Sequence, residues 1–293
     1  MRKIIALSAL CIVLAALSIP IGYFVLEGQQ NIDDISSNPE GTVSYLVNLD
    51  RSEGRRKYVM PSVKALAYPV QIVSAVDGKY LSDDEINQTT DIDAYEHSSN
   101  YYPSKGTIGC YLSHIKVWRE FLNSDYKFAV IFEDDVSFDP VKLKSVIEQL
   151  QANAEYWDIN SFEISHRGNP LTLKKLVDNY KLVVYSYKVS HSGAYIINRK
   201  AAKQLLEKSL PIRMPVDHYF TRSWELDLKF TGVEPRLVHQ SYGDSVISQM
   251  KELNNNKEVT TLYLFVYRGV FNIQTHIINY LHNWKIYLKY KYS

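Results

Sequence analysis

A run of apolar residues that ends in three adjacent carboxylates constrains this chain more than any other feature. Phe128 to Phe132 is typical of a buried strand, and Glu133, Asp134 and Asp135 follow it directly. Three neighbouring negative charges repel one another, and a divalent cation is the most effective agent to offset that repulsion. Acids at the end of a parallel strand point into the crevice where open α/β sheets bind ligands. The pattern suggests a site for a metal and a diphosphate, with a solvated acidic turn as the alternative.

Length and charge narrow the class of protein. The chain has 293 residues, a formal net charge of +1 and 46% hydrophobic residues, enough for one large domain or two small ones with a proper core. Because the charge is balanced, we expect no nucleic-acid partner.

The amino terminus suggests a membrane anchor. Arg2 and Lys3 precede an uncharged stretch from Ile4 to Leu26, which at about 1.5 Å per residue is long enough to cross a hydrocarbon core of about 30 Å. Because no good signal-peptidase site follows, we expect residues 1–27 to be an uncleaved anchor, with a cleaved signal as the alternative. Residues 28–41 are polar and are expected to be a linker.

The next part of the chain has the pattern of a βαβ unit. A strand from Val43 to Leu49 leads through a polar turn into a helix, and a second strand begins at Pro69 and ends in the turn Asp77-Gly78. Residues 80–103 are polar and poorly periodic, and we expect a mobile surface loop there.

A helix is predicted over residues 105–122, where apolar residues recur at helical spacing. Gly106 and Gly109 at its start would let a ligand approach backbone N–H groups, and Ser113 and His114 lie one turn further in. On spacing alone, His114 is either a ligand of this site or a structural histidine.

The second half of the chain alternates further strands and helices. Helices are expected over residues 141–153 and 199–208, and strands over 157–164, 182–189 and 233–240, the last at an edge of the sheet. Asp217 and His218 follow a proline-bounded turn.

With these pieces placed, the chain resembles glycosyltransferase family 25, the lipooligosaccharide and collagen-type sugar transferases. The resemblance covers roughly residues 42–250. It rests on four segments in the family's order, namely 45–51 with Arg55 and Arg56, 75–78, 106–114 with Trp118, and 131–136. One departure concerns Thr107, because similar proteins usually carry an acid there.

The resemblance implies a GT-A fold, which is a Rossmann-like α/β domain over residues 42–258 that binds a nucleotide sugar and a divalent metal. It implies an inverting transfer of a hexose, most often galactose or glucose, from a UDP-sugar to a glycan such as lipopolysaccharide. Glu133 and Asp135 would hold Mn²⁺ or Mg²⁺ against the diphosphate, with His239 as a further ligand. Asp134 would contact ribose or sugar hydroxyls. The nucleotide pocket would be lined by Asn48, Asp50, Arg51 and Asp77.

An inverting displacement also needs a base within reach of the attacking hydroxyl. Asp217 is the first candidate, because its turn follows strands that should reach the crevice, and Glu163 is the second. For either residue the alternative is a helix cap or a surface ion pair.

The carboxyl-terminal segment, residues 259–293, has no acidic residue and interleaves lysines with aromatic side chains. This composition suits a bilayer interface and a lipid-borne acceptor. The alternative is a helix packed on the catalytic domain, and a helix that is apolar nearly all round could do both.

Two other functions stay open. A haloacid-dehalogenase-type phosphatase also places acids after a strand, but its nucleophile is Asp at the first acid, where this chain has Glu133. A catalytically degenerate, membrane-anchored carbohydrate-binding protein is the second alternative, and Thr107 is the feature that supports it.

The sequence leaves two possibilities for the side of the membrane on which the domain lies. Positive charges before the amino-terminal stretch would place the domain outside the cytosol, as in a Golgi or ER lumen that supplies UDP-sugars. Asn87 begins a glycosylation sequon that fits this location. A bacterial inner membrane, which we favour, needs a cytosolic domain against the charge rule.

Overall fold

The computed structural model describes residues 40–99, 101–164, 168–240 and 262–292. The expected anchor, and the linker up to residue 39, lie outside these ranges. Among the helices of the described ranges, none is long and apolar enough to cross a membrane.

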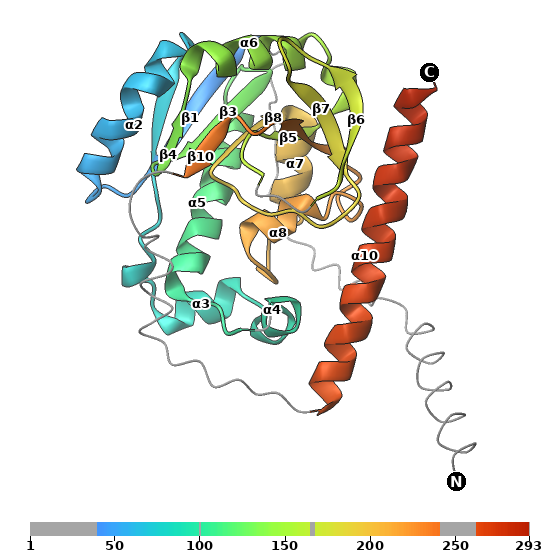
Figure 1. Ribbon diagram of the computed structural model, residues 1–293. Coiled ribbons are helices and arrows are strands. Elements are labelled where there is room, and N and C mark those ends of the chain that lie inside the picture. Colours follow the sequence, from blue (N-terminus) through green and yellow to red (C-terminus); the bar gives the residue numbers. More distant parts are fainter. Residues whose placement is uncertain (1–39, 100, 165–167, 241–261, 293) are drawn as a thin grey trace.

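The core of the molecule is a mixed sheet of eight strands in the order β2-β1-β3-β8-β5-β9-β7-β6 (Figure 1). The strands are β1 (Thr42–Asn48), β2 (Val70–Ser74), β3 (Phe128–Glu133), β5 (Ile159–Ser161), β6 (Pro170–Lys175), β7 (Lys181–Tyr185), β8 (Ala194–Asn198) and β9 (Phe230–Glu234). The fold class predicted from the sequence, α/β with a Rossmann-like sheet, agrees with this arrangement.

Strand direction decides where the site forms. Strands β2, β1 and β3 run parallel, and β8 runs antiparallel between β3 and β5. Therefore β5 points the same way as β3, and the carboxyl ends of β1, β2, β3 and β5 meet at one edge. Asn48, Glu133 and Glu163 come from these ends although they are far apart in the sequence.

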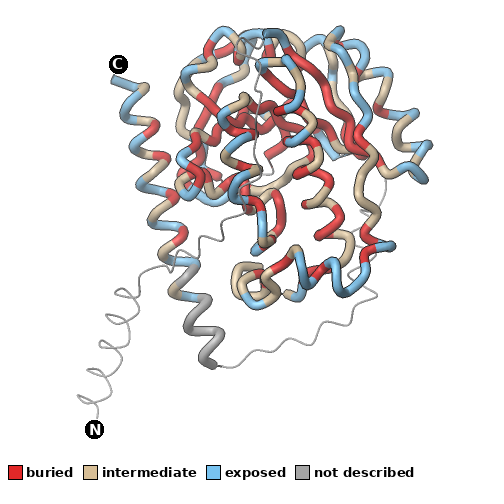
Figure 2. The backbone as a smooth tube through the Cα atoms, turned by 180° about the vertical axis from the view of Figure 1, so that it is seen from behind, coloured by how far each residue is buried: buried red, intermediate tan, exposed pale blue. Residues whose placement is uncertain are grey.

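Helices cover both faces of the sheet, because side chains alternate along each strand. Val43, Tyr45 and Val47 of β1 belong to one buried cluster, and Leu46 belongs to the other. Helices α5 (Lys105–Leu122), α7 (Arg199–Glu207) and α8 (Val216–Thr221) cover the first face, and α2 (Glu53–Ala65) and α6 (Pro140–Gln151) cover the second. Buried residues concentrate in the strands and in α5, as Figure 2 shows.

Several helices begin at side-chain caps that the sequence encodes locally. Ser104 accepts a hydrogen bond from the backbone N–H of Thr107 at the start of α5. Asp139 accepts two such bonds at the start of α6, where Pro140 occupies the first turn. These caps fix the two helices that flank the acidic strand.

Two expectations about secondary structure are wrong. Residues 80–103 are not a loop but contain the short helices η1 (Gly78–Tyr80), α3 (Asp83–Thr89) and α4 (Ile92–Ser99), with a capping box between Ser82 and Glu85 at the start of α3. Residues 233–240 are not one edge strand. Strand β9 lies inside the sheet, and β10 (Val238–Gln240) pairs with β4 (Val136–Phe138) in a separate ribbon, because Pro235 interrupts the run.

The carboxyl-terminal segment forms the predicted helix, α10 (Leu262–Lys291). Figure 1 shows it running along the side of the domain, where it lies against β6, β7 and α4. It therefore packs on the α/β domain, as one of the two alternatives expected from the sequence.

Candidate active site

A cavity of about 310 Å³ opens at the sheet edge where the parallel strands end. Its walls come from the ends of β1, β2 and β3, the first two turns of α5, the segment before β8 and the start of α8. This volume is at the lower end of the range typical for small-molecule sites.

Asp134 lies in the cavity wall, but both its carboxylate oxygens are already bound. Asn48 Nδ2 donates to Oδ2 at 2.7 Å, and an Arg55 guanidinium N–H donates to Oδ1 at 3.0 Å. Through these bonds Asp134 fixes Arg55 and the end of β1. The ribose or sugar contact expected of Asp134 stays a prediction.

Asp135 has a free oxygen. Its Oδ2 accepts a hydrogen bond from Gln240 Nε2 at 3.0 Å, whereas its buried Oδ1 has no hydrogen-bond partner in the described part of the chain. Burial, and next the negative charge of Glu133, raise the pKa of Asp135 to about 6. A buried acceptor in this state is costly unless a ligand or cation satisfies it.

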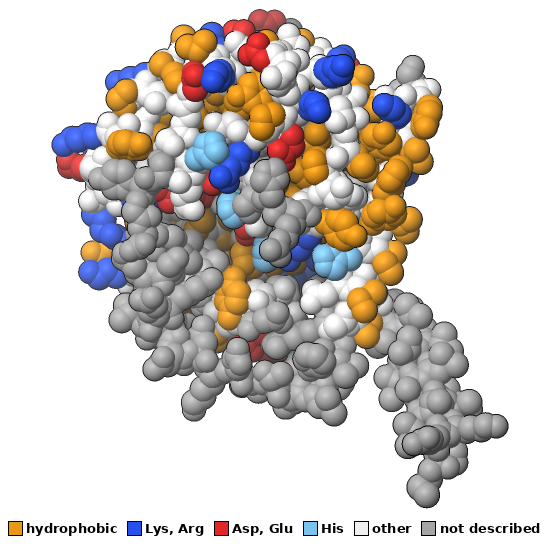
Figure 3. Space-filling view, in the orientation of Figure 1, with side chains coloured by type: hydrophobic (Ala, Val, Ile, Leu, Met, Phe, Trp, Pro, Cys, Tyr) orange, Lys and Arg blue, Asp and Glu red, His pale blue; other side chains and the backbone are white. Residues whose placement is uncertain are grey.

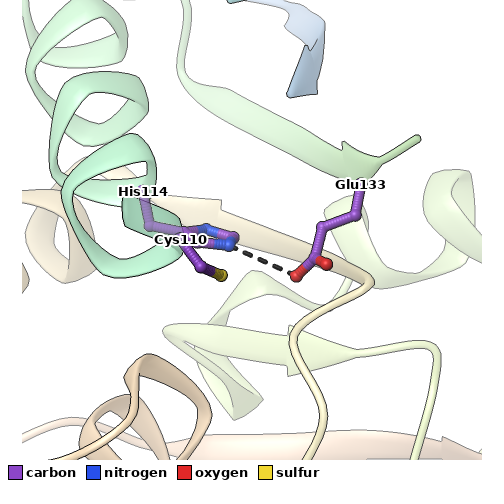
Figure 4. A group of neighbouring side chains, drawn as sticks. All are labelled: Cys110, His114 and Glu133. Atoms are coloured by element: carbon purple, nitrogen blue, oxygen red, sulfur yellow. Dashed lines mark hydrogen bonds and ion pairs between the residues drawn. The ribbon is translucent and has the colours of Figure 1, made fainter. Parts of the chain in front are cut away.

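Glu133 is held by two neighbours in the cavity. The Ser192 hydroxyl donates to its Oε1 at 2.6 Å, and His114 Nε2 lies 3.4 Å from the same oxygen (Figure 4). Burial alone would raise the pKa of Glu133, but the hydrogen bond and the charge of His114 outweigh it and lower that pKa. Tyr195 orients His114, since its hydroxyl lies 2.7 Å from Nδ1.

Cys110 is a residue that the sequence analysis did not single out. It lies one turn before His114 on α5, and Figure 4 shows both side chains directed toward Glu133. The ligand atoms of the three residues lie within 4.8 Å of one another. The i, i+4 spacing of Cys110 and His114 was the available signal. Burial raises the pKa of the Cys110 thiol, which keeps the thiol protonated.

Glu163 lies just beyond the end of β5 and is buried in the same cavity. Its Oε2 accepts a hydrogen bond from the backbone N–H of Gly193 at 3.1 Å. Burial, and then the negative charges of Glu133 and Asp135, raise the pKa of Glu163 to about 8. Without a cation, the carboxyl group is thus protonated at neutral pH.

Gly193 is required for this approach. A Cβ atom at Gly193 would lie 2.3 Å from Glu163 Oε2 and 3.0 Å from Val136 Cγ1. We expect Gly193→Ala to push the Glu163 side chain out of place and to destabilise the fold by about 1–3 kcal/mol, the usual cost of overpacking. Denaturant unfolding measures the change.

The control for this prediction is a double-mutant cycle. In a Glu163→Ala background, the added methyl has room, so Gly193→Ala should cost clearly less there than alone. Equal costs in the two backgrounds would contradict the proposed collision.

The predicted nucleotide-pocket residues divide into two groups. Arg51, Asp77, Gly106, Ser113 and His114 line the cavity. Arg51 Nε donates to Asp77 Oδ2 at 2.6 Å, and Ser113 accepts a hydrogen bond from the Val76 backbone N–H at 2.8 Å.

Three of the predicted residues have other tasks. Asn48 binds Asp134, and Asp50 accepts a hydrogen bond from the Ser74 hydroxyl at 2.8 Å. Gly109 packs closely on the segment after β2, since a Cβ there would lie 2.6 Å from the Val76 carbonyl oxygen. None of the three is part of the cavity lining.

His239 does not reach the cavity. It lies in β10 between Val238 and Gln240, and neighbouring side chains of a strand point to opposite faces. Gln240 is the residue that contacts Asp135, so the structure brings Gln240 rather than His239 to the predicted metal site.

Asp217 lies in the first turn of α8 and lines the cavity. Its Oδ2 accepts a hydrogen bond from the backbone N–H of His191 at 3.1 Å, and Oδ1 accepts one from the N–H of His218 at 2.8 Å. Both candidates for the base therefore lie at one cavity.

The residues of the cavity fit a divalent cation. Four carboxylates, Glu133, Asp134, Asp135 and Glu163, line it together. Asp135 also offers a buried oxygen that is unsatisfied within the described ranges. Oxygen-rich sites of this kind suit Mg²⁺ and Mn²⁺.

Comparison with known proteins decides the family. The model of glycosyltransferase family 25, described as an LPS biosynthesis protein family, matches residues 42–220. The chain belongs to glycosyltransferase family 25. The match ends before α10, so this helix lies outside the part that defines the family.

Curated members of family 25 are similar over the same domain. A glycosyltransferase 25 family member of Aedes aegypti is 32% identical over 60% of this chain and 30% of its own length. A procollagen galactosyltransferase 1 of Danio rerio is 23% identical over 68% of this chain and 36% of its own length. A probable inactive glycosyltransferase 25 family member 3 of Bos taurus is 26% identical over 69% of this chain and 37% of its own length. The chain thus spans about a third of the length of these relatives.

Thr107, the departure from the family pattern, is buried in the cavity wall. Its backbone N–H donates to the Ser104 hydroxyl at 3.1 Å, and the two side-chain hydroxyls lie 2.8 Å apart. Thr107 therefore strengthens the cap of α5 and leaves the cavity one carboxylate fewer.

Proposed function

We propose that this protein is a metal-dependent, inverting glycosyltransferase that moves a hexose, galactose or glucose, from a UDP-sugar to a glycan acceptor such as lipopolysaccharide. The observation that carries the proposal is the buried Oδ1 of Asp135 beside Glu133 in the cavity, which has no hydrogen-bond partner among the residues that the structure describes. Family membership supports the reaction class. The galactosyltransferases among the relatives support the sugar.

Glu133 and Asp135 would hold Mn²⁺ or Mg²⁺ together with the diphosphate oxygens of the donor. A bound cation would stabilise the negative charge that grows on the departing UDP. Arg55 and Arg51 lie on the same wall and would contact phosphates through their guanidinium donors.

On the acceptor side, Asp217 would accept the proton of the attacking hydroxyl. Its place on α8 leaves the space between it and the acidic strand for the sugar. Glu163 lies deeper, so we assign it the positioning of the donor sugar by hydrogen bonding.

The strand-end carboxylates are proposed as the metal site in preference to Cys110. Mn²⁺ and Mg²⁺ prefer oxygen ligands to the sulfur that Cys110 offers. We expect Cys110→Ser to change Mn²⁺-dependent turnover by less than about threefold, since serine keeps the size of the side chain. Titration of activity with Mn²⁺ measures this, and a loss comparable to that of a Glu133 variant would place the cation between Cys110, His114 and Glu133 instead.

Donor hydrolysis and transfer by the full-length chain test the proposed function, with a panel of UDP-sugars, with and without Mn²⁺. Turnover of one donor that needs the metal supports the transferase. Metal-dependent UDP binding without turnover would support the degenerate carbohydrate-binding protein, an alternative that the inactive relatives and Thr107 favour. Absence of any metal-dependent UDP-sugar binding would overturn both.

We also propose that the protein works at a membrane, through the uncharged stretch Ile4 to Leu26 and through α10. A bacterial inner membrane is our proposed location, with a Golgi or ER membrane as the alternative. A glycolipid acceptor would be presented at such a surface.

A further inference from the structure

Helix α10 turns mostly polar residues toward the domain and large apolar residues away from it. On the side that faces the domain, the buried residues are largely polar, namely Thr275, Asn279, Asn283 and Ile286. On the other side, large apolar residues are between 44% and 61% exposed, namely Ile273, Ile277, Tyr280, Leu281 and Leu288. An ordinary surface helix buries its apolar face and exposes its polar face.

Specific hydrogen bonds hold α10 in this orientation. Asn283 Nδ2 donates to the Tyr185 carbonyl at 2.8 Å, and His282 Nε2 donates to the Leu228 carbonyl at 3.1 Å. Near the end of the helix, the Tyr290 hydroxyl donates to the Glu155 carbonyl at 2.6 Å. The polar face is thus matched to the domain, and the helix would lose these bonds if it rotated to bury its apolar stripe.

The exposed residues form one continuous stripe. They recur at three- and four-residue spacing from Ile273 to Leu288, and Figure 3 shows hydrophobic side chains along α10. Trp284 is half-buried, with its indole N–H turned inward, and it borders the stripe between Tyr280 and Tyr287, whose ring centroids lie 5.8 and 5.3 Å from its own. A stripe of this size on a monomer marks an interaction surface.

The charge of α10 indicates what binds to the apolar stripe. The helix has no acidic residue, and Lys285, Lys289 and Lys291 are exposed near its carboxyl-terminal half. Aromatic residues and lysines around an apolar stripe suit anionic lipid headgroups, whereas a second copy would oppose the same lysines to one another. The helix is too polar to span a bilayer, which agrees with a position in its interface.

We propose that the outward stripe of α10, Ile273, Ile277, Tyr280, Leu281 and Leu288, with Trp284 at its border, is a lipid-binding surface that lies in the interface of an anionic membrane. The inference deepens the proposed membrane location by naming the surface that contacts lipid. It does not depend on the transferase reaction.

The test uses Trp284 as a native probe in the full-length chain. With vesicles of brominated phosphatidylglycerol and phosphatidylcholine, we expect quenching of tryptophan fluorescence that Trp284→Phe removes when both proteins also carry Trp224→Phe. Of the four tryptophans, Trp118 and Trp157 are fully buried in the core and Trp224 is half-buried, so replacing Trp224 leaves Trp284 as the accessible probe. Quenching should weaken with salt and with vesicles of phosphatidylcholine alone. The amino-terminal stretch cannot produce this signal, since it contains no tryptophan.

A matched variant makes the result specific. Ile277→Gln with Leu281→Gln should reduce the Trp284-dependent quenching at least about tenfold, because it removes buried apolar area, and should leave thermal unfolding unchanged, because both side chains are exposed. Lys203→Gln on α7 serves as the control and should have no effect. Absence of Trp284-dependent quenching overturns the proposal, and so does a dimer that the double variant dissociates. Metal-dependent UDP binding, measured in parallel, reports on the donor site independently.

Discussion

Replacing Glu133 or Asp135 by alanine is expected to reduce metal-dependent transfer by at least about a thousandfold. The proposed cation contributes several kcal/mol to the stabilisation of the leaving diphosphate, and each loss of about 1.4 kcal/mol costs a factor of ten in rate. The isosteric variants Glu133→Gln and Asp135→Asn should fall nearly as far, because they keep shape but remove the charge that binds the metal. Turnover of the preferred UDP-sugar with saturating Mn²⁺ measures the effect.

The control separates loss of the site from loss of the fold. Asp135 is a buried carboxylate whose pKa is raised to about 6, so its replacement by asparagine should not destabilise the metal-free protein. Glu148→Ala, on the outer helix α6, should leave both turnover and stability unchanged. Full activity of Asp135→Asn and Glu133→Gln would remove the metal from the mechanism.

The second large effect is a pH dependence of stability that comes from Glu163. In the metal-free fold its pKa rises from 4.5 to about 8, through burial first and then through the charges of Glu133 and Asp135. A carboxyl group with a raised pKa binds its proton more tightly in the folded chain. Its contribution to stability is therefore complete below about pH 4.5 and is lost as pH rises through about 8. At about 1.4 kcal/mol per pKa unit, the loss is on the order of a few kcal/mol.

Glu163→Gln should remove most of this dependence, because a neutral amide has no proton to lose. Urea unfolding of the metal-free protein between pH 5 and 8.5 is the measurement. The unfolding free energy of Glu163→Gln should change less with pH than that of the wild type, and the variant should be the more stable of the two near pH 8.5. Glu148→Gln is the exposed control, with the wild-type slope expected. An unchanged slope in Glu163→Gln would show that Glu163 does not carry this dependence.

Mn²⁺ should also reduce the change of the unfolding free energy with pH in the wild-type protein. A cation close to Glu133 and Asp135 offsets their charge, so it favours the ionised form of Glu163 and releases protons on binding. The pH dependence of stability and the binding of the metal therefore both depend on the same cluster of carboxylates.

Much of this arrangement is local and could be predicted from the sequence. The alternation and runs of apolar residues locate β1, β3 and α5, because strand and helix periods differ and a buried face needs apolar side chains at that period. The acids at the end of β3 are likewise local, and their mutual repulsion, which needs compensation, is what predicts a site there. The caps at Ser104 and Asp139 are equally local, because each joins a side chain to backbone N–H groups two or three residues on.

The tertiary structure alone decided which distant residues these side chains contact. Asp134 accepts hydrogen bonds from Asn48 and Arg55, which lie some 80 residues earlier in the chain, and no local pattern specifies these contacts. The choice between His239 and Gln240 depends on which face of β10 turns toward Asp135, and a shift of one residue reverses it. The pKa of Glu163 depends on strand order, because only the sheet brings β5 beside the acids of β3. The orientation of α10 is set by hydrogen bonds to distant carbonyl groups, and no period in its own sequence specifies which side faces the domain.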